Sequence, residues 1–383
     1  TMADNKDKKV LNVPALRFPE FTEEWREYAI GNVLSIGNGR DYKHLHNGDI
    51  PVFGTGGYMT SVDDFLYDGE SVFIGRKGTI NKPLYYNGKF WTVDTLFYTH
   101  SFVNVLPKFA YCLFQTINWL KYNEASGVPS LSKATIEKIK VRIPSMDEQD
   151  KLSNQLFLLD KRIEVQNKII EKYESLIQAM CDTLIGKKTQ QVMLSFNDFG
   201  ESYSGLSGKS AEDFGEGSPY ITYMNVYQNQ IIDITDIGLV KINKTEQQSL
   251  VQYGDILFTL SSETPEEVGM GAVYLGETYP LYLNSFCFGI HITDESKIFP
   301  PFLAYYVSSE SFRKAVFPLA QGSTRFNLQK GDFLKKVFPF PAIEQQRKIY
   351  SILKTYSDKL NIEKQMIKLL CCQKQYLLRQ LFI

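Results

Sequence analysis

The chain has 383 residues, of which 43% are hydrophobic and 14% aromatic, so it is long enough for two or three domains with buried cores. It contains no run of about 18 apolar residues and begins without an apolar signal core, so we expect neither a membrane span nor export. The five cysteines show no paired spacing, which favours free thiols in the cytoplasm over a disulfide scaffold.

The net charge of −1 is distributed unevenly along the chain. Residues 1–145 carry 17 basic and 15 acidic side chains, and residues 146–190 carry 7 and 8. Residues 191–340 carry 10 basic and 17 acidic side chains, whereas residues 341–383 carry 8 and 3. The acidic region argues against a non-specific nucleic-acid binder, because such binding depends on neutralising phosphates.

Residues 1–145 are expected to form a domain of mixed α and β structure. Short aromatic and β-branched runs separated by glycine predict strands with tight turns. These runs cover residues 71–80 and 83–100, and similar runs return at 220–226, 254–262 and 285–293. His44 and His46 could face a metal ion together, but no third ligand lies near them in the sequence, so a polar turn is favoured.

Two long helices are predicted from one repeated pattern. IPSMDEQDKL (143–152) is followed 197 positions later by FPAIEQQRKI (340–349). Proline disfavours helix in the residue before it, and the acidic residues that follow suit the positive end of a new helix. The pattern predicts helices over about 147–185 and 344–382, and each would be about 58 Å long.

Both predicted helices carry the apolar seam of a coiled coil, in which apolar residues alternate by four and three positions. The seam residues of the first helix are Leu152, Leu156, Leu159, Ile163, Ile170, Tyr173, Ile177, Met180 and Leu184. Those of the second are Ile349, Leu353, Tyr356, Leu360, Ile367, Leu370, Leu377 and Leu381, with Lys374 interrupting where Ile177 stands in the first. Gln166 and Glu363 occupy the centres of the two seams, where a polar residue typically fixes the register.

The order of the segments predicts that the helices run antiparallel if they pack together. The first helix leads into residues 190–340, and these lead directly into the second helix, so both helices have an end on the same domain. The alternative is that each amphipathic helix packs separately on its own domain.

The chain is therefore predicted to be α+β, with two mixed α/β domains separated by a pair of long antiparallel coiled-coil helices in a pseudo-twofold tandem repeat. The segments are a domain at 1–145, a helix at 146–186, a domain at 190–340 and a helix at 341–383. Within the domains, 67–74 corresponds to 252–259, 90–100 to 281–291 and 106–115 to 299–309. The loops at 40–49 and 54–61 have no counterpart at 204–213 and 220–229, which suggests that the domains recognise different things.

The sequence lacks the motifs of a catalyst. GLSGKS (205–210) resembles part of a phosphate-binding loop, but Tyr203 occupies the position of a required glycine. We find no dinucleotide-binding GxGxxG after a strand, no Asn-Pro-Pro-Tyr-like run of the adenine methyltransferases and no nucleophile elbow. With four histidines in the whole chain, we expect no catalysis by this protein alone.

The opening segment PALRFPEFTEEW (14–25) and the two repeated helix starts resemble the specificity subunits of type I restriction-modification systems, in order and over nearly the whole chain. The resemblance implies two target recognition domains that read the two parts of a split double-stranded DNA sequence, with the helices setting the unread spacer. It also implies two methyltransferase subunits, which methylate adenine, and two restriction or motor subunits as partners. S-adenosylmethionine, ATP and magnesium would be bound by those partners and none by this chain.

Base edges are read by polar side chains that loops place in the major groove. The candidates in the first domain are Arg40, Lys43, Thr55, Arg76, Lys77, Ser130 and Lys133, with Gly54, Gly56 and Gly57 allowing close approach of the backbone. Those in the second are Ser207, Lys209, Tyr223, Asn225, Ser261, Ser262, Arg325 and Asn327. Arg76 is the strongest candidate because it lies in a basic turn after a strand, and Arg325 is expected to play the same part in the second domain.

A second hypothesis is a non-catalytic coiled-coil spacer that holds two protein-binding domains. The acidic second domain favours it, because a DNA-binding surface is normally basic.

Overall fold

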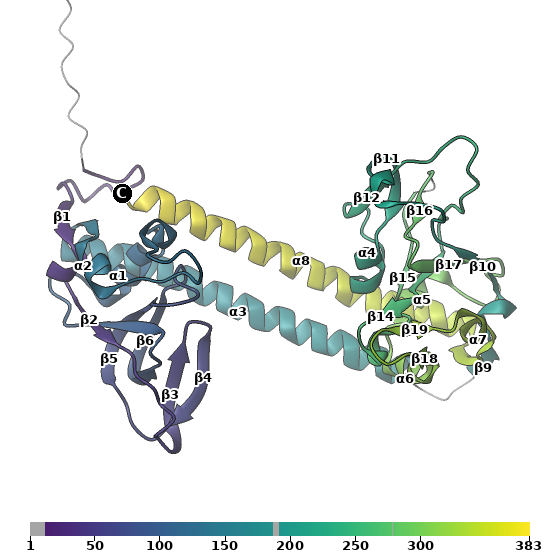
Figure 1. The fold of residues 1–383 in the computed structure, drawn as a ribbon, viewed down its shortest axis with the longest axis horizontal. Coiled ribbons are helices and arrows are strands. Elements are labelled where there is room, and N and C mark those ends of the chain that lie inside the picture. Colours follow the sequence, from purple (N-terminus) through teal and green to yellow (C-terminus); the bar gives the residue numbers. More distant parts are fainter. Residues whose placement is uncertain (1–11, 187–190, 278) are drawn as a thin grey trace, which may run out of the picture. The chain divides into compact units, whose positions relative to one another are not determined.

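The computed structural model describes residues 12–186, 191–277 and 279–383. The chain forms two compact units (Figure 1). Of the described residues, unit 1 contains those within 12–168 and 365–383, and unit 2 contains those within 169–364. Each unit thus combines one α/β domain with one part of each long helix. Residues 187–190, which belong to the short segment GKKTQQ (186–191) between the first long helix and the second domain, lie outside the described residues.

The two long helices are α3 (Met146–Ile185) and α8 (Ile343–Leu381), and both begin one residue before the predicted start. In unit 1, Leu152 and Leu156 of α3 share a core with Leu378 and Leu381 of α8. In unit 2, Cys181 and Ile185 of α3 share a core with Ile349 and Leu353 of α8. The early part of α3 therefore meets the late part of α8, and the late part of α3 meets the early part of α8. Within each unit the helices pack antiparallel, as predicted, and no predicted seam residue is exposed.

Unit 1 is built on a six-stranded sheet. The strand order is β2 (Ser35–Asn38), β7 (Leu96–His100), β5 (Tyr67–Gly75), β6 (Leu84–Thr92), β3 (Asn47–Gly54) and β4 (Gly57–Val62). A separate antiparallel pair joins β1 (Arg26–Ala29) to β8 (Lys140–Ile143), and the helices α1 (Pro107–Phe114) and α2 (Lys133–Lys138) complete the domain. Val72 and Phe97 of the sheet pack with Phe109 of α1 in a core that also includes the long helices.

Unit 2 divides its strands among smaller sheets. A four-stranded sheet has the order β10 (Gly200–Ser204), β17 (Cys287–Ile292), β13 (Ile256–Thr259) and β15 (Gly271–Val273), and a second has β12 (Ile237–Val240), β11 (Phe214–Ile221) and β16 (Tyr282–Leu283). A third contains β14 (Ser261–Ser262), β19 (Phe326–Leu328) and β18 (Ala320–Gln321), and β9 (Gln191–Leu194) pairs with β20 (Phe338–Pro341). The helices are α4 (Tyr223–Gln228), α5 (Pro300–Tyr306), α6 (Glu310–Val316) and α7 (Lys330–Lys335).

The prediction of a strand over 220–226 is wrong in its second half. Strand β11 ends at Ile221, and the Thr222 side chain accepts a hydrogen bond from the Asn225 backbone N–H (3.1 Å). This N-cap satisfies a backbone donor at the start of α4 and so favours a helix over continued strand.

The repeated sequence at the two helix starts has a repeated structural role, and its centre is a glutamine. Gln149 Nε2 donates to the Asn104 and Pro144 carbonyls (both 3.0 Å), and its Oε1 accepts from Leu106 N (2.8 Å). Gln346 makes the same three bonds with Lys297 O, Pro341 O and Phe299 N, at 3.0, 2.8 and 2.9 Å. Both glutamines are fully buried. Each side chain therefore ties the start of a long helix to the loop before the helix α1 or α5.

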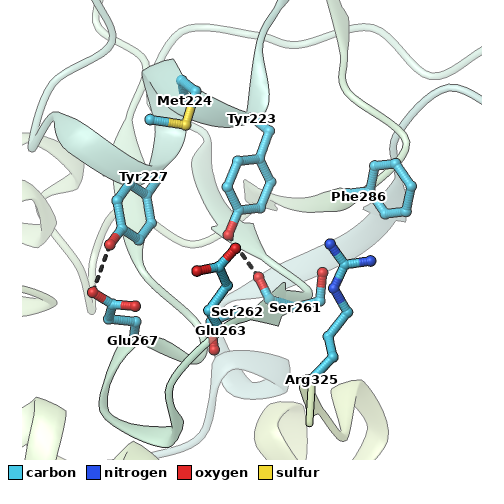
Figure 2. A pocket seen from close by; sticks show the side chains of 9 residues that line it. All are labelled: Tyr223, Met224, Tyr227, Ser261, Ser262, Glu263, Glu267, Phe286 and Arg325. Carbon is cyan, nitrogen blue, oxygen red and sulfur yellow. Dashed lines mark hydrogen bonds between the residues drawn. The ribbon is translucent and has the colours of Figure 1, made fainter. Parts of the chain in front are cut away.

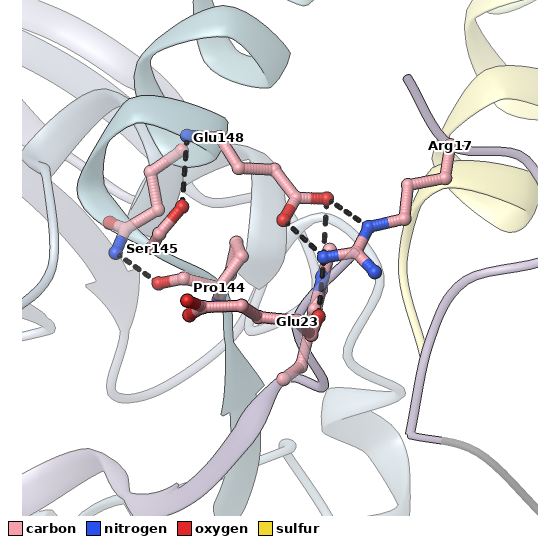
Figure 3. Close-up of polar contacts among 7 residues, drawn as sticks. Arg17, Glu23, Pro144, Ser145 and Glu148 are labelled. Atoms are coloured by element: carbon pink, nitrogen blue, oxygen red, sulfur yellow. Dashed lines mark hydrogen bonds and ion pairs between the residues drawn. The ribbon is translucent and has the colours of Figure 1, made fainter. Parts of the chain in front are cut away.

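The first copy has an additional ion pair, which connects it to the N-terminal segment (Figure 3). Arg17 Nε and Nη2 donate to the Glu148 carboxylate at 2.8 and 2.7 Å, and Trp25 Nε1 donates to it at 3.3 Å. This pairing raises the pKa of Arg17, chiefly through the hydrogen bond to Glu148. The Trp25 ring also packs edge-on against Phe382 at the end of α8, with 6.1 Å between ring centroids. The opening segment therefore closes the core of unit 1 rather than forming an element of its own.

The lysine that interrupts the second seam is half-buried and paired. Lys374 Nζ lies 2.5 Å from Asp160 Oδ1 of α3, and its ammonium group lies 5.9 Å from the centre of the Tyr111 ring. The positions that correspond in unit 2, by the offset of 197, are Ile177 and Ser357. The two ends of the helix pair thus differ in polarity at one matched position.

Candidate nucleic-acid interface

Six backbone hydrogen bonds recur at matching positions of the two units and hold the candidate loops together; we call each set the loop frame. In unit 1 they run from Gly39 N to Leu96 O, Arg40 N to Thr92 O, Arg76 N to Thr95 O, Val93 N to Phe53 O, Leu96 N to Val93 O and Leu131 N to Arg76 O. In unit 2 they run from Gly205 N to Cys287 O, Leu206 N to Leu283 O, Leu260 N to Phe286 O, Asn284 N to Ile221 O, Cys287 N to Asn284 O and Leu328 N to Leu260 O. All twelve measure between 2.7 and 3.1 Å.

One frame position requires glycine in both units. A Cβ atom on Gly39 would lie 1.9 Å from the Val93 carbonyl oxygen, and one on Gly205 would lie 2.0 Å from the Asn284 carbonyl oxygen. No side chain fits at such distances, so these two glycines let the loop backbone reach the central turn.

The frame corrects the predicted repeat by one residue. The sequence comparison set Ile74 opposite Thr259, but Gly75 pairs with Leu96 as Thr259 pairs with Cys287. A shift of one residue moves a strand's side chains to the other face, so the difference affects every assignment along the strand. The counterpart of Arg76 is consequently Leu260.

The prediction that Arg325 plays the part of Arg76 is therefore wrong in position. Arg325 comes from the loop before β19 and not from the turn after β13.

In unit 1 the frame brings most of the candidate residues to one turn, 92–96. Arg40 and Arg76 bond to this turn through their backbone, and Lys77 pairs with Ser130 in an isolated bridge. Thr55 stands at the tip of the β3–β4 hairpin, and its Oγ1 would lie 3.8 Å from a Cβ built on Gly78.

The other unit 1 candidates lie at the edges of this cluster. Gly54 and Gly57 close the hairpin, where Gly57 has a φ of 107°, and Gly56 lies at its open tip. Lys43 is exposed in the loop that follows Arg40, and Lys133 is exposed at the start of α2 beside Glu137 (3.7 Å).

The guanidinium of Arg76 is held only loosely. Its Nη1 lies 3.4 Å from the Asp94 carbonyl oxygen, and its Cζ lies 5.8 Å from the centre of the Phe97 ring. The loop between Glu124 and α2 is held more firmly than the Arg76 side chain, because the Glu124 carboxylate accepts hydrogen bonds from Thr135 and from Ser132. These bonds, that from Thr135 first, hold the pKa of Glu124 below its ordinary value. An exposed cation on a hydrogen-bonded turn is suited to reaching a base edge.

In unit 2 four candidates line a pocket of about 440 Å³ (Figure 2). They are Tyr223, Ser261, Ser262 and Arg325. The Tyr223 hydroxyl donates to the Ser261 carbonyl (2.6 Å), and Asn327 pairs with Ser261 between β19 and β14. The pocket therefore lies at the loop frame, as the unit 1 cluster does.

The tyrosines of the pocket are fixed by their hydroxyl groups. The rings of Tyr223 and Tyr227 are stacked, with centroids 5.9 Å apart. Tyr227 donates to Glu267 Oε1 (2.7 Å), and this bond raises the pKa of Tyr227 to about 12 and lowers that of Glu267.

Two candidates of the second domain face inward, and their assignment as base-reading residues is corrected. Asn225 is fully buried and bonds to the Asp233 and Asp236 carbonyls at 2.8 and 2.6 Å. The Lys209 side chain is 3% exposed and pairs with Glu246 at 2.5 Å. Both side chains stabilise loops, because their polar atoms are already used inside the unit.

Two further candidates have partly internal roles. Ser262 is buried, and its hydroxyl donates to the Thr264 carbonyl at 2.5 Å. Ser207 is exposed, while its backbone bonds to the Gln248 side chain at 3.1 and 2.9 Å.

The sequence analysis missed Phe286, Glu263 and Glu267, which also line the pocket. Phe286 is 58% exposed at the frame position that Thr95 occupies in unit 1. The sequence could have pointed to Phe286, because the matched segments 90–100 and 281–291 already set it opposite Thr95. The two frames therefore differ at this position, with a large exposed ring in unit 2 and a small polar residue in unit 1.

Within the described ranges, no group of three or more His, Cys, Asp and Glu side chains could hold a metal ion. No helix in this part of the chain is long and apolar enough to cross a membrane.

Two similar α/β units that present different loops on the same frame define a tandem recognition protein. The family model "Type I restriction modification DNA specificity domain" matches residues 22–175 and 193–370, and the chain belongs to this family. It is a DNA specificity subunit of a type I restriction-modification system, the component that is not itself catalytic.

Relatives of known description agree with this assignment. The MjaVIII specificity subunit of Methanocaldococcus jannaschii is 24% identical over 92% of this chain and 84% of its own length. A putative type I specificity subunit of Haemophilus influenzae is 20% identical over 82% of both chains.

The fold agrees as well. The crystal structure of the type I S subunit from M. genitalium matches with a TM-score of 0.63, covers 97% of this chain and 99% of its own, and is 17% identical. A structure described as explaining complex assembly and conformational transition of a type I system matches with a TM-score of 0.55 at 13% identity, over 92% of this chain and 96% of its own.

Proposed function

We propose that this specificity subunit reads a split DNA target, with one half-site for each α/β domain. The domain at 1–145 would read one half, the domain at 190–340 the other, and the helix segments 146–186 and 341–383 would set the unread spacer. The observation that carries the proposal is the repeated loop frame, which presents Thr55, Lys77 and Ser130 in one unit and Tyr223, Ser261 and Asn327 at the matching places in the other. One backbone design with two sets of side chains suits two different half-sites.

The residues proposed to read DNA are those that the structure leaves accessible around the frames. In unit 1 they are Arg40, Lys43, Thr55, Arg76, Lys77, Ser130 and Lys133, with Gly54, Gly56 and Gly57 shaping the hairpin. In unit 2 they are Ser207, Tyr223, Ser261, Arg325 and Asn327, with Ser262 supporting the pocket floor.

The proposed partners are double-stranded DNA, two methyltransferase subunits that modify adenine, and two restriction or motor subunits. Each unit leaves apolar side chains of its long helices exposed, such as Leu158 and Leu369 in unit 1 and Ile362 in unit 2, and a partner would cover them. The partners would supply S-adenosylmethionine, ATP and magnesium, and the complex would act in the cytoplasm. Much of the phosphate contact would come from those subunits, so an acidic second domain is compatible with DNA binding.

Gln166 and Glu363 are proposed to fix the helix register. Gln166 is 8% exposed in α3, and Glu363 is half-buried in α8 beside Lys359 (2.8 Å). A polar group within an apolar seam disfavours shifted pairings.

The proposal is tested by co-expressing the chain with its methyltransferase subunit and sequencing the methylated adenines of the host genome. A motif in two parts with a fixed gap is the expected result. Methylation without sequence preference would refute the proposal.

Arg76→Ala tests the first domain. We expect methylation of the wild-type motif to fall roughly tenfold or more, or one position of one half-site to become relaxed, because a base contact of arginine contributes about 1–3 kcal/mol. Arg26→Ala, which removes an exposed arginine from β1, is the matched control and should leave the motif unchanged. An unchanged motif for Arg76→Ala in an intact complex would exclude this residue.

A further inference from the structure

Two groups of polar side chains line the pocket of unit 2 (Figure 2). We call the half-buried side chains whose polar atoms are hydrogen-bonded the floor, and the exposed side chains the rim. On the floor, the Tyr223 and Tyr227 hydroxyls donate to Ser261 O and Glu267. Glu267 is used at both oxygens, because Oε2 also accepts from Thr264 at 2.9 Å. On the rim, neither the Glu263 carboxylate nor the Arg325 guanidinium makes a hydrogen bond or an ion pair with any described residue, and both residues are exposed.

The rim therefore offers one strong acceptor and one strong forked donor beside the exposed ring of Phe286. In the major groove, arginine pairs with guanine O6 and N7, and a glutamate accepts from cytosine N4. These edges are adjacent in a single C·G pair. A T·A pair would instead present the O4 acceptor of thymine to the carboxylate, which is repulsive.

We infer that the pocket reads one C·G base pair of the half-site recognised by the second domain, with Glu263 accepting from cytosine N4 and Arg325 donating to guanine. This inference rests on the proposed function and adds the identity of one base pair. Counted from the matched positions Lys77/Ser261 and Ser130/Asn327, the places of Glu263 and Arg325 are taken in unit 1 by Thr79 and Val128. Neither carries a charge, so the requirement belongs to one half-site only.

The inference also gives a role to a negative charge at a DNA-binding surface. A carboxylate near phosphates is unfavourable, so its presence is useful only where it meets an amino group. A cationic side chain of a protein partner is the competing occupant, but the Arg325 guanidinium on the same rim opposes its binding.

Glu263→Gln and Arg325→Lys test the inference in the chain co-expressed with its methyltransferase subunit. Glutamine keeps the size of glutamate but adds a donor, and lysine keeps the charge but loses the fork. We expect each variant to lower the preference for C·G by roughly 5- to 150-fold at one position, the same for both, because one good base contact gives about 1–3 kcal/mol of discrimination. The other half-site should be unchanged.

Glu266→Gln is the matched control, since it makes the same change three residues away on an exposed side chain outside the pocket. A split motif for the wild type supports the proposed function in every case. The inference is wrong if both variants keep the wild-type motif, if the two variants relax different positions, or if they relax a base pair other than C·G. If wild type itself shows no sequence preference, the proposed function fails.

Two remaining outcomes are also decisive. If a variant loses methylation everywhere, duplexes that differ at each half-site position are compared for binding to the purified complex. An equal loss for all duplexes would show that the residue only positions the DNA, and would overturn the inference. Loss of co-purification with the methyltransferase subunit would assign the pocket to a protein partner instead.

Discussion

At the scale of single residues, two glutamines explain why the chain repeats one short sequence. Gln149 and Gln346 are fully buried, and each bonds to two carbonyls and one N–H where a long helix begins. Only a side-chain amide offers two donors and an acceptor in this arrangement, whereas glutamate lacks the donors. The identity of this residue is therefore set by the backbone around it.

Gln149→Glu is expected to destabilise unit 1 by about 2–4 kcal/mol, because the carboxylate would face two carbonyl oxygens and leave them unsatisfied. Hydrogen-exchange mass spectrometry resolves the loss, since peptides of unit 1 should lose protection while those of unit 2 keep it. Gln155→Glu makes the same change on an exposed position of α3 and should have an effect within about 0.5 kcal/mol. Equal protection in the two variants would contradict the role of Gln149.

Single residues also mark where sequence reasoning stops. The candidates around Arg76 and in the unit 2 pocket could be chosen from loop position and residue type. Asn225 and Lys209 were chosen by the same criteria, but their side chains are buried inside the unit. Polar side chains in loops either hold the loop or extend from it, and partner atoms far away in sequence decide which. Glu246, the partner of Lys209, lies 37 positions away, and no sequence pattern around it indicates that the two side chains pair.

At the scale of elements, the long helices were predictable because their periodicity is long and regular. Both helices begin one residue before the predicted start, α3 ends at the predicted residue and α8 ends one residue before it, and the antiparallel packing inside each unit follows from connectivity. Short elements were less predictable, since α4 depends on one capping side chain and the repeat shifts by one residue at β5 and β13. A seam interruption at Lys374 could be seen in the sequence, but its partner Asp160 could not.

The pair of Lys374 with Asp160 can be converted to the arrangement of unit 2. Lys374→Ile alone should destabilise unit 1 by about 1–3 kcal/mol, because it leaves a half-buried carboxylate without its cation. Adding Asp160→Ser should recover most of that loss, since serine and isoleucine are the residues at the matching positions, Ser357 and Ile177. Urea unfolding of the four proteins of this double-mutant cycle measures the coupling, and additive effects would show that the ion pair contributes nothing specific.

At the scale of the whole molecule, the two helices are continuous chains that pass from one unit into the other, at residues 168–169 and 364–365. Inserting seven residues at both points adds one heptad, preserves the seam and lengthens each helix by about 10 Å. Because a helical turn of DNA covers about 34 Å in about 10 base pairs, the unread spacer of the methylated motif should grow by about three base pairs. An unchanged spacer would refute the role of the helices, and insertion in one helix only, which misaligns the seam, should impair assembly.

The loop frame has a consequence for how such a protein can evolve. Every bond of the frame joins main-chain atoms, so substituting an exposed frame residue such as Arg76 leaves the bonds in place, whereas Gly39 and Gly205 are restricted by space and buried frame residues such as Leu96 and Ile221 by core packing. Selection for a new DNA sequence can therefore act on the side chains that the frame displays while selection for folding acts on the frame itself. Variants with altered targets should arise by few substitutions and without passing through unfolded intermediates.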